Sequence, residues 1–220
     1  MAGEPEITLP MIRERLTSAL VSDALDRLGY RRQSPALRLL PWTGVTKLVG
    51  RAKTTLWADM AHDDPRPYEL ELRAVDSCQP DDVIVCATGG STRSAVWGEL
   101  LSTAARNRGC GGVVVDGAVR DVAKMTALAF PCFALATNVY DSLHRQRVID
   151  IDVPVELGGV TCAPGELVIV DLDGMVVIPR AVEAEAICSA WQKAHTETRI
   201  LTDLRLGLTA TEAFRRHGTL

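Results

Sequence analysis

Two short segments of the chain carry side chains that could bind and polarise a small acid. In the first, Asp116-Gly117-Ala118-Val119-Arg120-Asp121 follows the apolar run Val113–Val115. Such a run is typical of a buried strand, and open α/β sheets bind ligands beyond the carboxyl ends of their strands. Arg120 offers a planar fork for a carboxylate, and Asp121 is a hard oxygen ligand suited to Mg²⁺ or Mn²⁺. The alternative is a local Arg–Asp ion pair at the start of a helix.

The second segment ends in Gly98-Glu99-Leu100-Leu101 and follows the turn Gly89-Gly90-Ser91. We expect Gly98 to lie near a helix start, where free backbone N–H groups bind anions such as a substrate carboxylate. Glu99 could place a second acid near the metal. The alternative is an ordinary helix with Glu99 in its first turn, where the helix dipole favours an acid. Because both segments follow neighbouring predicted strands, we expect them to converge.

The residues around these segments predict alternating strands and helices. Apolar runs predict three buried strands, at Val83–Ala87, Gly112–Val115 and Phe130–Leu135. Helical patterns fill the two gaps, over 95–106 and 118–128. Units of this kind build a parallel or mixed sheet covered by helices.

The flanking regions complete the predicted α/β fold. Ile12–Leu28 predicts one amphipathic helix that ends at Gly29; the alternative is a second helix start capped by Ser22. Three elements follow: a strand at Val49–Trp57, a surface loop at Ala61–Tyr68 and a short helix at Glu69–Asp76. Glycines and prolines then mark β-hairpins between residues 153 and 178.

Two helices are expected to close the chain. Ala181–Thr202 predicts a long helix and Thr209–His217 a short one, with Thr209 and Glu212 at capping-box spacing. No linker or repeat interrupts the pattern. We therefore expect a single domain over residues 1–220, with C-terminal helices from about residue 181.

Composition excludes several classes of protein. The 220 residues are 47% hydrophobic and 24% charged, with a net charge of −4, which is typical of a globular domain without a nucleic-acid-binding patch. The N-terminus lacks a secretory pattern, and no apolar run approaches the roughly 20 residues of a membrane helix. Six cysteines without a CxxC pair predict buried thiols in a cytoplasmic protein. The four histidines show no metal-ligand spacing.

Taken together, the two segments resemble the ribonuclease-activity-regulator-A-like (RraA-like) family, which includes the class II 4-hydroxy-4-methyl-2-oxoglutarate aldolases. The matching pattern places Arg120 nineteen positions after Leu101. Further similar stretches lie near both ends, at Ser22-Asp23-Ala24-Leu25, at Pro164-Gly165-Glu166, and from Asp171-Leu172-Asp173-Gly174 to Ile178-Pro179. The loop His62–Tyr68 and the stretch after Leu201 depart from the aldolases, and the loop could reshape the pocket.

The resemblance implies an α/β/β sandwich similar to the swivelling phosphohistidine domain, assembled as a homotrimer or a homohexamer with sites between subunits. It implies that residues 98–101 hold a pyruvate carboxylate, that Arg120 contacts the substrate, and that Asp121 binds a divalent cation. A glutamate of the neighbouring subunit's C-terminal helix can contribute in the family. Glu197 is the best positional match, with a solvated helix residue as the alternative.

The implied activity is that of a lyase. It would cleave 4-hydroxy-4-methyl-2-oxoglutarate, or decarboxylate oxaloacetate, through a pyruvate enolate whose charge Mg²⁺ or Mn²⁺ shares with Arg120. One alternative is a non-catalytic binding protein that inhibits ribonuclease E, and the joint presence of Glu99, Arg120 and Asp121 argues against it. Another is a different enzyme on the same scaffold that enolises another keto acid.

Overall fold

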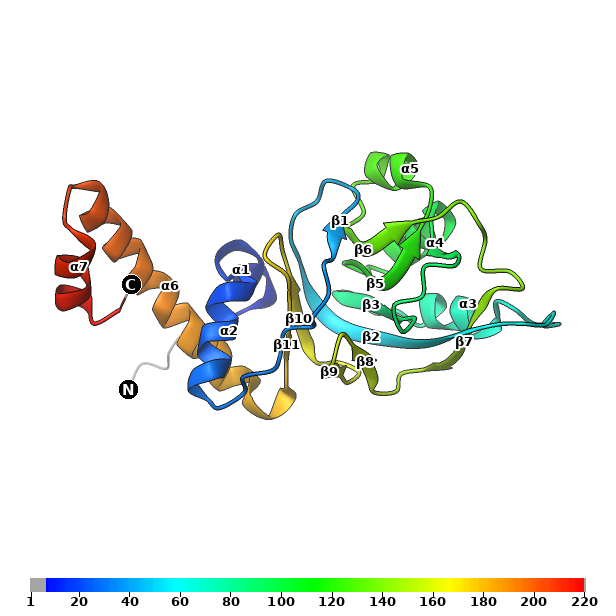
Figure 1. The fold of residues 1–220 in the computed structure, drawn as a ribbon, viewed down its shortest axis with the longest axis horizontal. Coiled ribbons are helices and arrows are strands. Elements are labelled where there is room, and N and C mark those ends of the chain that lie inside the picture. The colour runs from blue at the N-terminus through cyan, green and yellow to red at the C-terminus, as the bar shows by residue number, and fades with distance from the viewer. Residues whose placement is uncertain (1–6, 220) are drawn as a thin grey trace.

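A curled, mixed β-sheet forms the centre of the computed structural model, which describes residues 7–219 (Figure 1). Within this range its strands run in the order β1-β6-β5-β3-β2-β10-β11, with β4 beside β5 and β7 beside β2. The strands are β1 (Leu40–Pro41), β2 (Leu48–Asp59), β3 (Asp82–Ala87), β4 (Ala95–Trp97), β5 (Gly112–Val119), β6 (Cys132–Thr137), β7 (Gln146–Ile151), β10 (Leu167–Val170) and β11 (Met175–Ile178). The parallel pairing of β2, β3, β5 and β6 confirms the predicted strand–helix units.

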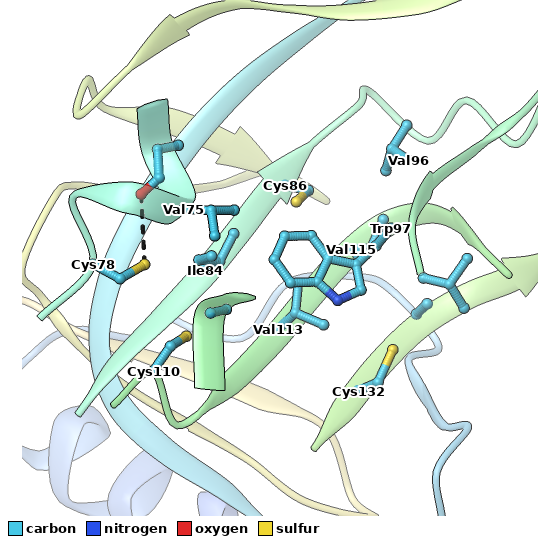
Figure 2. Close-up of a cluster of buried hydrophobic side chains, with 14 of the residues drawn as sticks. Val75, Cys78, Ile84, Cys86, Val96, Trp97, Cys110, Val113, Val115 and Cys132 are labelled. Carbon is cyan, nitrogen blue, oxygen red and sulfur yellow. Dashed lines mark hydrogen bonds between the residues drawn. The ribbon is translucent and has the colours of Figure 1, made fainter. Parts of the chain in front are cut away.

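Three helices cover one face of this sheet: α3 (Glu69–Asp76), α4 (Glu99–Asn107) and α5 (Val122–Ala127). Side chains alternate between the faces of a strand, so Ile84 and Cys86 of β3 pack against these helices. Figure 2 shows this cluster, in which Trp97 lies among the valines of β5. Helix α4 thus lies against β5, the strand that leads to Arg120, and α3 lies against β2 and β7.

A short hairpin covers the opposite face. Its strands β8 (Val155–Leu157) and β9 (Val160–Cys162) pack on Val83 and Val85 of β3 and on their neighbours in the sheet. Helices, sheet and hairpin therefore make three layers, and the predicted mixed α/β fold is confirmed. The similarity to the swivelling phosphohistidine domain stays a prediction.

The terminal helices form a separate layer beside β10 and β11. They are α1 (Leu9–Arg15), α2 (Ser18–Arg27), the short 3₁₀ helix η1 (Arg180–Val182), α6 (Glu183–Arg205) and α7 (Ala210–His217). The first half of α6 packs on α2 and β11, and its second half extends away from the sheet, where α7 folds back beside it (Figure 1). The predicted capping box of Thr209 and Glu212 is confirmed.

The prediction of one helix over Ile12–Leu28 was wrong. The chain breaks at Leu16, and Thr17 caps α2 by accepting a hydrogen bond from the backbone N–H of Leu20. Ser22 therefore lies inside α2 and caps nothing. The apolar period runs across the break because both helices bury their side chains in one cluster.

Two predicted helices of the middle region begin later than expected. Residues 95–97 form strand β4, so the helix expected over 95–106 begins at Glu99. Strand β5 continues to Val119, so the helix expected from Ala118 begins at Val122. Both corrections have one cause, since β4 pairs with the last residues of β5.

Predictions for cysteines and membrane spans have simple outcomes. No disulfide joins the six cysteines, all within residues 7–219, and five of them are buried. In the same range every helix is too short or too polar to cross a lipid bilayer. The prediction that the N-terminus lacks a secretory segment stays a prediction, because residues 1–6 lie outside the described range.

Candidate active site

The start of α4 is fixed by hydrogen bonds from the core. Gly98 is the N-cap of this helix and directly follows β4. The buried indole of Trp97 donates from Nε1 to Ser102 Oγ at 2.8 Å, and that hydroxyl donates to the Gly98 carbonyl at 2.9 Å. The core thus holds in place the turn that was predicted to bind an anion.

Arg120 and Asp121 follow β5 without a break. The Arg120 backbone N–H donates to the Trp97 carbonyl at 2.9 Å, which ties the two predicted segments together. Asp121 is the N-cap of α5 and has a left-handed backbone, with φ 58° and ψ 30°. This conformation is uncommon for residues other than glycine and is concentrated at functional sites.

Gly98 allows a close approach between these segments. A Cβ atom at this position would lie 2.8 Å from Asp121 Oδ2 and 3.3 Å from Arg120 Cγ, both closer than ordinary contact. The Asp121 carboxylate also accepts a long hydrogen bond, 3.4 Å, from the Glu99 backbone N–H. The structure therefore brings together the residues that the sequence predicted to converge.

These residues open into a cavity of about 270 Å³, which suits a ligand smaller than a typical drug. Residues from four segments line it: Tyr68, Glu71, Leu72, Ala95, Val96, Trp97, Gly98, Leu100, Leu101, Arg120, Asp121, Asp141 and Ser142. A second, more open hollow of about 950 Å³ shares Arg120 and Asp121 and extends toward Trp42 and Asn138. Arg120 and Asp121 thus border both the small cavity and the wider hollow.

A hydrogen-bonded network holds the Arg120 guanidinium. Arg120 Nη2 donates to one carboxylate oxygen of Asp141, and the Tyr68 hydroxyl donates to the other at 2.8 Å. Burial acts to raise the pKa of Asp141, but the backbone N–H of Leu143, the Tyr68 hydroxyl and the Arg120 charge lower it. Asp141 is therefore a carboxylate that orients Arg120.

Glu71 of α3 is the unexpected member of the cavity wall. Its side chain is 8% exposed, and its Oε2 has no hydrogen-bond partner among the described residues. Burial, reinforced by the charge of Asp141, raises the pKa of Glu71 to about 8, although Arg120 acts in the opposite sense. The carboxyl group is therefore mostly protonated at neutral pH.

Sequence reasoning missed Tyr68, Glu71 and Asp141. The loop His62–Tyr68 gave the one signal, because it departs from the aldolase pattern, and the structure does place Tyr68 in the cavity wall.

Neither of the two predicted glutamates lines the cavity. The Glu99 carboxylate pairs with Lys124 Nζ at 2.9 Å, and Glu99 does not number among the described residues of the cavity wall. Glu197 pairs with Lys193 on α6, a helix that extends away from the side of the molecule where α3 and α4 lie (Figure 1). Their roles in catalysis, for Glu197 from a neighbouring subunit, stay predictions.

The donor set decides which metal the site could accept. Residues 7–219 contain no group of three His, Cys, Asp or Glu side chains placed to hold a metal. Asp121 offers one carboxylate, whose side chain is 37% exposed at the cavity. Mg²⁺ typically binds through one or two carboxylates and keeps several waters, whereas structural zinc needs four protein ligands. One carboxylate meets what a hydrated Mg²⁺ requires of a protein and not what structural zinc requires, and Mg²⁺ or Mn²⁺ at Asp121 stays a prediction.

Comparison with known proteins gives consistent matches. A family model described as Aldolase/RraA, RraA-like, matches residues 18–177. A protein of Halalkalibacterium halodurans named "Putative 4-hydroxy-4-methyl-2-oxoglutarate aldolase" is 33% identical over 178 residues, 81% of this chain and 80% of that protein. A crystal structure from Pseudomonas syringae has a TM-score of 0.81 at 28% identity, over 93% of this chain and 95% of its own. Streptomyces coelicolor RraAS2, described as an unusual member of the RNase ES inhibitor RraA protein family, has a TM-score of 0.76 at 28% identity, over 90% and 98%.

Proposed function

Because the chain belongs to the RraA-like (Aldolase/RraA) family, we propose that it is a lyase that breaks a carbon–carbon bond of a small pyruvate-containing keto acid. The observation that carries this proposal is the meeting of the α4 start, Arg120 and Asp121 at one cavity. The candidate substrates are 4-hydroxy-4-methyl-2-oxoglutarate and oxaloacetate, since cleavage of either gives a pyruvate enolate. The name of one relative supports the first.

The start of α4 is suited to a substrate carboxylate. The first N–H groups of a helix have no partner inside the helix, and their partial positive charge favours anions. Leu100 and Leu101 of this first turn line the cavity. Their N–H groups can bind one carboxylate of the keto acid, so that the neighbouring carbonyl can reach Arg120.

Arg120 is the group that we expect to stabilise the charge that develops when the bond breaks. A guanidinium is always protonated and carries five N–H donors. Asp141 engages Nη2, which leaves donors for the enolate oxygen and fixes the plane of the fork. Donors held in place before the reaction need little reorganisation, which is the main source of electrostatic catalysis.

Asp121 is the residue that we expect to hold Mg²⁺ or Mn²⁺, with water completing the coordination. When bound, the cation supplies Lewis-acid polarisation of the substrate carbonyl. The carboxylate of Asp121 is positioned for this by its own backbone conformation and by the close approach of Gly98.

The alternative function, inhibition of a ribonuclease, is suggested by the similarity to RraAS2, whose family is described as RNase ES inhibitors. The cavity favours the lyase, because a protein that acts only by binding a large partner has no need of a cavity that joins Arg120 to the α4 start. The alternative predicts capture of ribonuclease E and no effect of metal.

The test is pyruvate release from each candidate substrate with Mg²⁺, with Mn²⁺ and with EDTA. We expect activity that depends on the cation and falls at least about 100-fold in Arg120→Ala, as when other charge-stabilising donors are removed. Arg108→Ala is the matched control, because that arginine is exposed and its nearest acid, Asp76, is 3.9 Å away. Full activity in Arg120→Ala, or in EDTA, would contradict the proposal.

We also propose that the chain assembles as a homotrimer or homohexamer. Large apolar side chains are exposed where α6 and α7 extend from the sheet, among them Leu201, Leu206 and Phe214. A surface of this kind supports contact with another subunit. Light scattering should give the mass of three or six chains, and a monomeric mass would exclude both assemblies.

A further inference from the structure

The carboxyl group of Glu71 requires an explanation that its surroundings do not give. Buried polar groups in proteins are nearly always hydrogen-bonded, and a buried acid without a partner destabilises the fold. Glu71 is only 8% exposed, its Oε2 has no partner among the described residues, and it lines the cavity of Arg120 and Asp121. A buried carboxyl group that destabilises the fold and lies in the wall of a cavity points to a role in binding or reacting with a ligand.

The charged and ionisable groups around Glu71 differ in what they can do. The charges of Arg120 and Asp141, which belong to two loops, act on the Glu71 carboxyl group. The ionisable groups of Tyr68, before α3, and of Cys86, on β3, also interact with Glu71. Burial and the hydrogen bond to Asp141 raise the pKa of Tyr68 to about 12, and burial raises the pKa of Cys86. The lowered pKa of Asp141 keeps it ionised, and the guanidinium of Arg120 offers hydrogen-bond donors but no acceptor.

Glu71 is therefore well suited to proton transfer. Burial raises its pKa to about 8, near the value at which a general acid works best in neutral solution. Its buried Oε2 has no hydrogen-bond partner among the described residues, so no hydrogen bond holds that oxygen of the carboxyl group. By contrast, Glu69 of the same helix is half exposed, and its Oε2 lies 3.3 Å from Nη1 of Arg66.

We infer that Glu71 is the catalytic acid that gives a proton to C3 of the enolate, an inference that rests on the proposed lyase function. When the C3–C4 bond breaks, its electron pair forms the enolate of pyruvate. C4 leaves as the carbonyl carbon of the second product, with its hydroxyl proton released to solvent, or as CO2 when the substrate is oxaloacetate. The Glu71 O–H bond then breaks, the C3–H bond forms, and the C2 carbonyl returns. Solvent restores the proton to the Glu71 carboxylate before the next turnover.

The reverse step gives a direct assay. An enzyme that protonates the enolate at C3 must also remove a C3 proton from pyruvate, so its methyl hydrogens exchange with deuterium oxide. Proton NMR follows this exchange with pyruvate and Mg²⁺ alone. We expect at least a roughly 100-fold slower exchange in Glu71→Gln, the usual contribution of a general acid or base. Glu69→Gln is the matched control and should exchange at the wild-type rate.

The pH profile distinguishes a proton donor from a structural residue. In the wild type, kcat/KM should fall as the pH rises through about 8, since only the protonated acid can donate. Glu71→Gln should lack this alkaline limb and keep its low activity across the range. A merely structural role would lower activity without removing the limb.

Two further arms keep the outcome clear. If Glu71→Gln does not fold, Glu71→Leu, which removes the buried polar group altogether, must fold and show the same loss of exchange. Wild-type exchange and an unchanged alkaline limb in a folded variant would overturn the inference while leaving the lyase intact. A wild-type protein that releases no pyruvate from any keto acid would instead overturn the proposed function.

Discussion

Replacing Glu71 by glutamine should change the way that stability depends on pH. Glu71 ionises at about pH 4.5 in the unfolded chain, whereas burial raises its pKa to about 8 in the folded protein. Between these values the unfolded chain binds fewer protons, so the free energy of unfolding falls as the pH rises. Each pH unit corresponds to about 1.4 kcal/mol, which gives a loss of about 5 kcal/mol over the whole interval. Stability from the protonated carboxyl is complete below about pH 4.5 and lost above about pH 8.

Urea unfolding at fixed protein concentration, in EDTA and at several pH values between about 4 and 9, measures this effect. The wild type should lose stability relative to Glu71→Gln by roughly 5 kcal/mol, because the amide does not titrate. Glu69→Gln is the control and should follow the wild type, since Glu69 is half exposed. A difference between wild type and Glu71→Gln that stays within about 1 kcal/mol across the range would refute the buried, protonated carboxyl.

Two substitutions test the geometry of the site. Gly98→Ala adds a Cβ at 2.8 Å from Asp121 Oδ2 and 3.3 Å from Arg120 Cγ. We expect kcat/KM to fall by about 100-fold with an unchanged Tm, as for displacements of about 1 Å at other sites. A wild-type kcat/KM would show that the close approach does not matter. Tyr68→Phe removes the hydroxyl that donates to Asp141 at 2.8 Å. The loss of one hydrogen bond to a charged group should lower kcat/KM about 10-fold. Steady-state kinetics that match the wild type would show that this hydrogen bond does not help to orient Arg120.

Much of the fold could be predicted because it depends on local signals. The apolar runs of β3 and β5 are buried on both faces, and the bounds of α3 agree with its helical pattern. Gly98 and Arg120 were expected to converge because parallel neighbours end at the same edge of a sheet. In these cases the sequence pattern and the tertiary structure favour the same arrangement.

The parts that were missed depend on contacts between distant residues. Strand β4 is three residues long and exists through its pairing with β5, and β7 (Gln146–Ile151) carries a mixed pattern that is ordered by pairing with β2. No sequence pattern marks Glu71 as buried, because it alternates with leucines in Glu69-Leu70-Glu71-Leu72 and would be expected on the solvent side. Its environment is made by Asp141 and Arg120, which lie 70 and 49 positions away.

The left-handed backbone of Asp121 restricts how this corner of the molecule can diverge. At φ 58° a β-branched side chain would meet severe crowding, whereas asparagine, histidine and glycine tolerate the angle. A residue that replaces Asp121 must therefore first be compatible with the left-handed backbone, whatever the chemistry of its side chain. Descendants of the chain that abandon cation binding should most readily carry asparagine at residue 121, with the surrounding loop left unaltered.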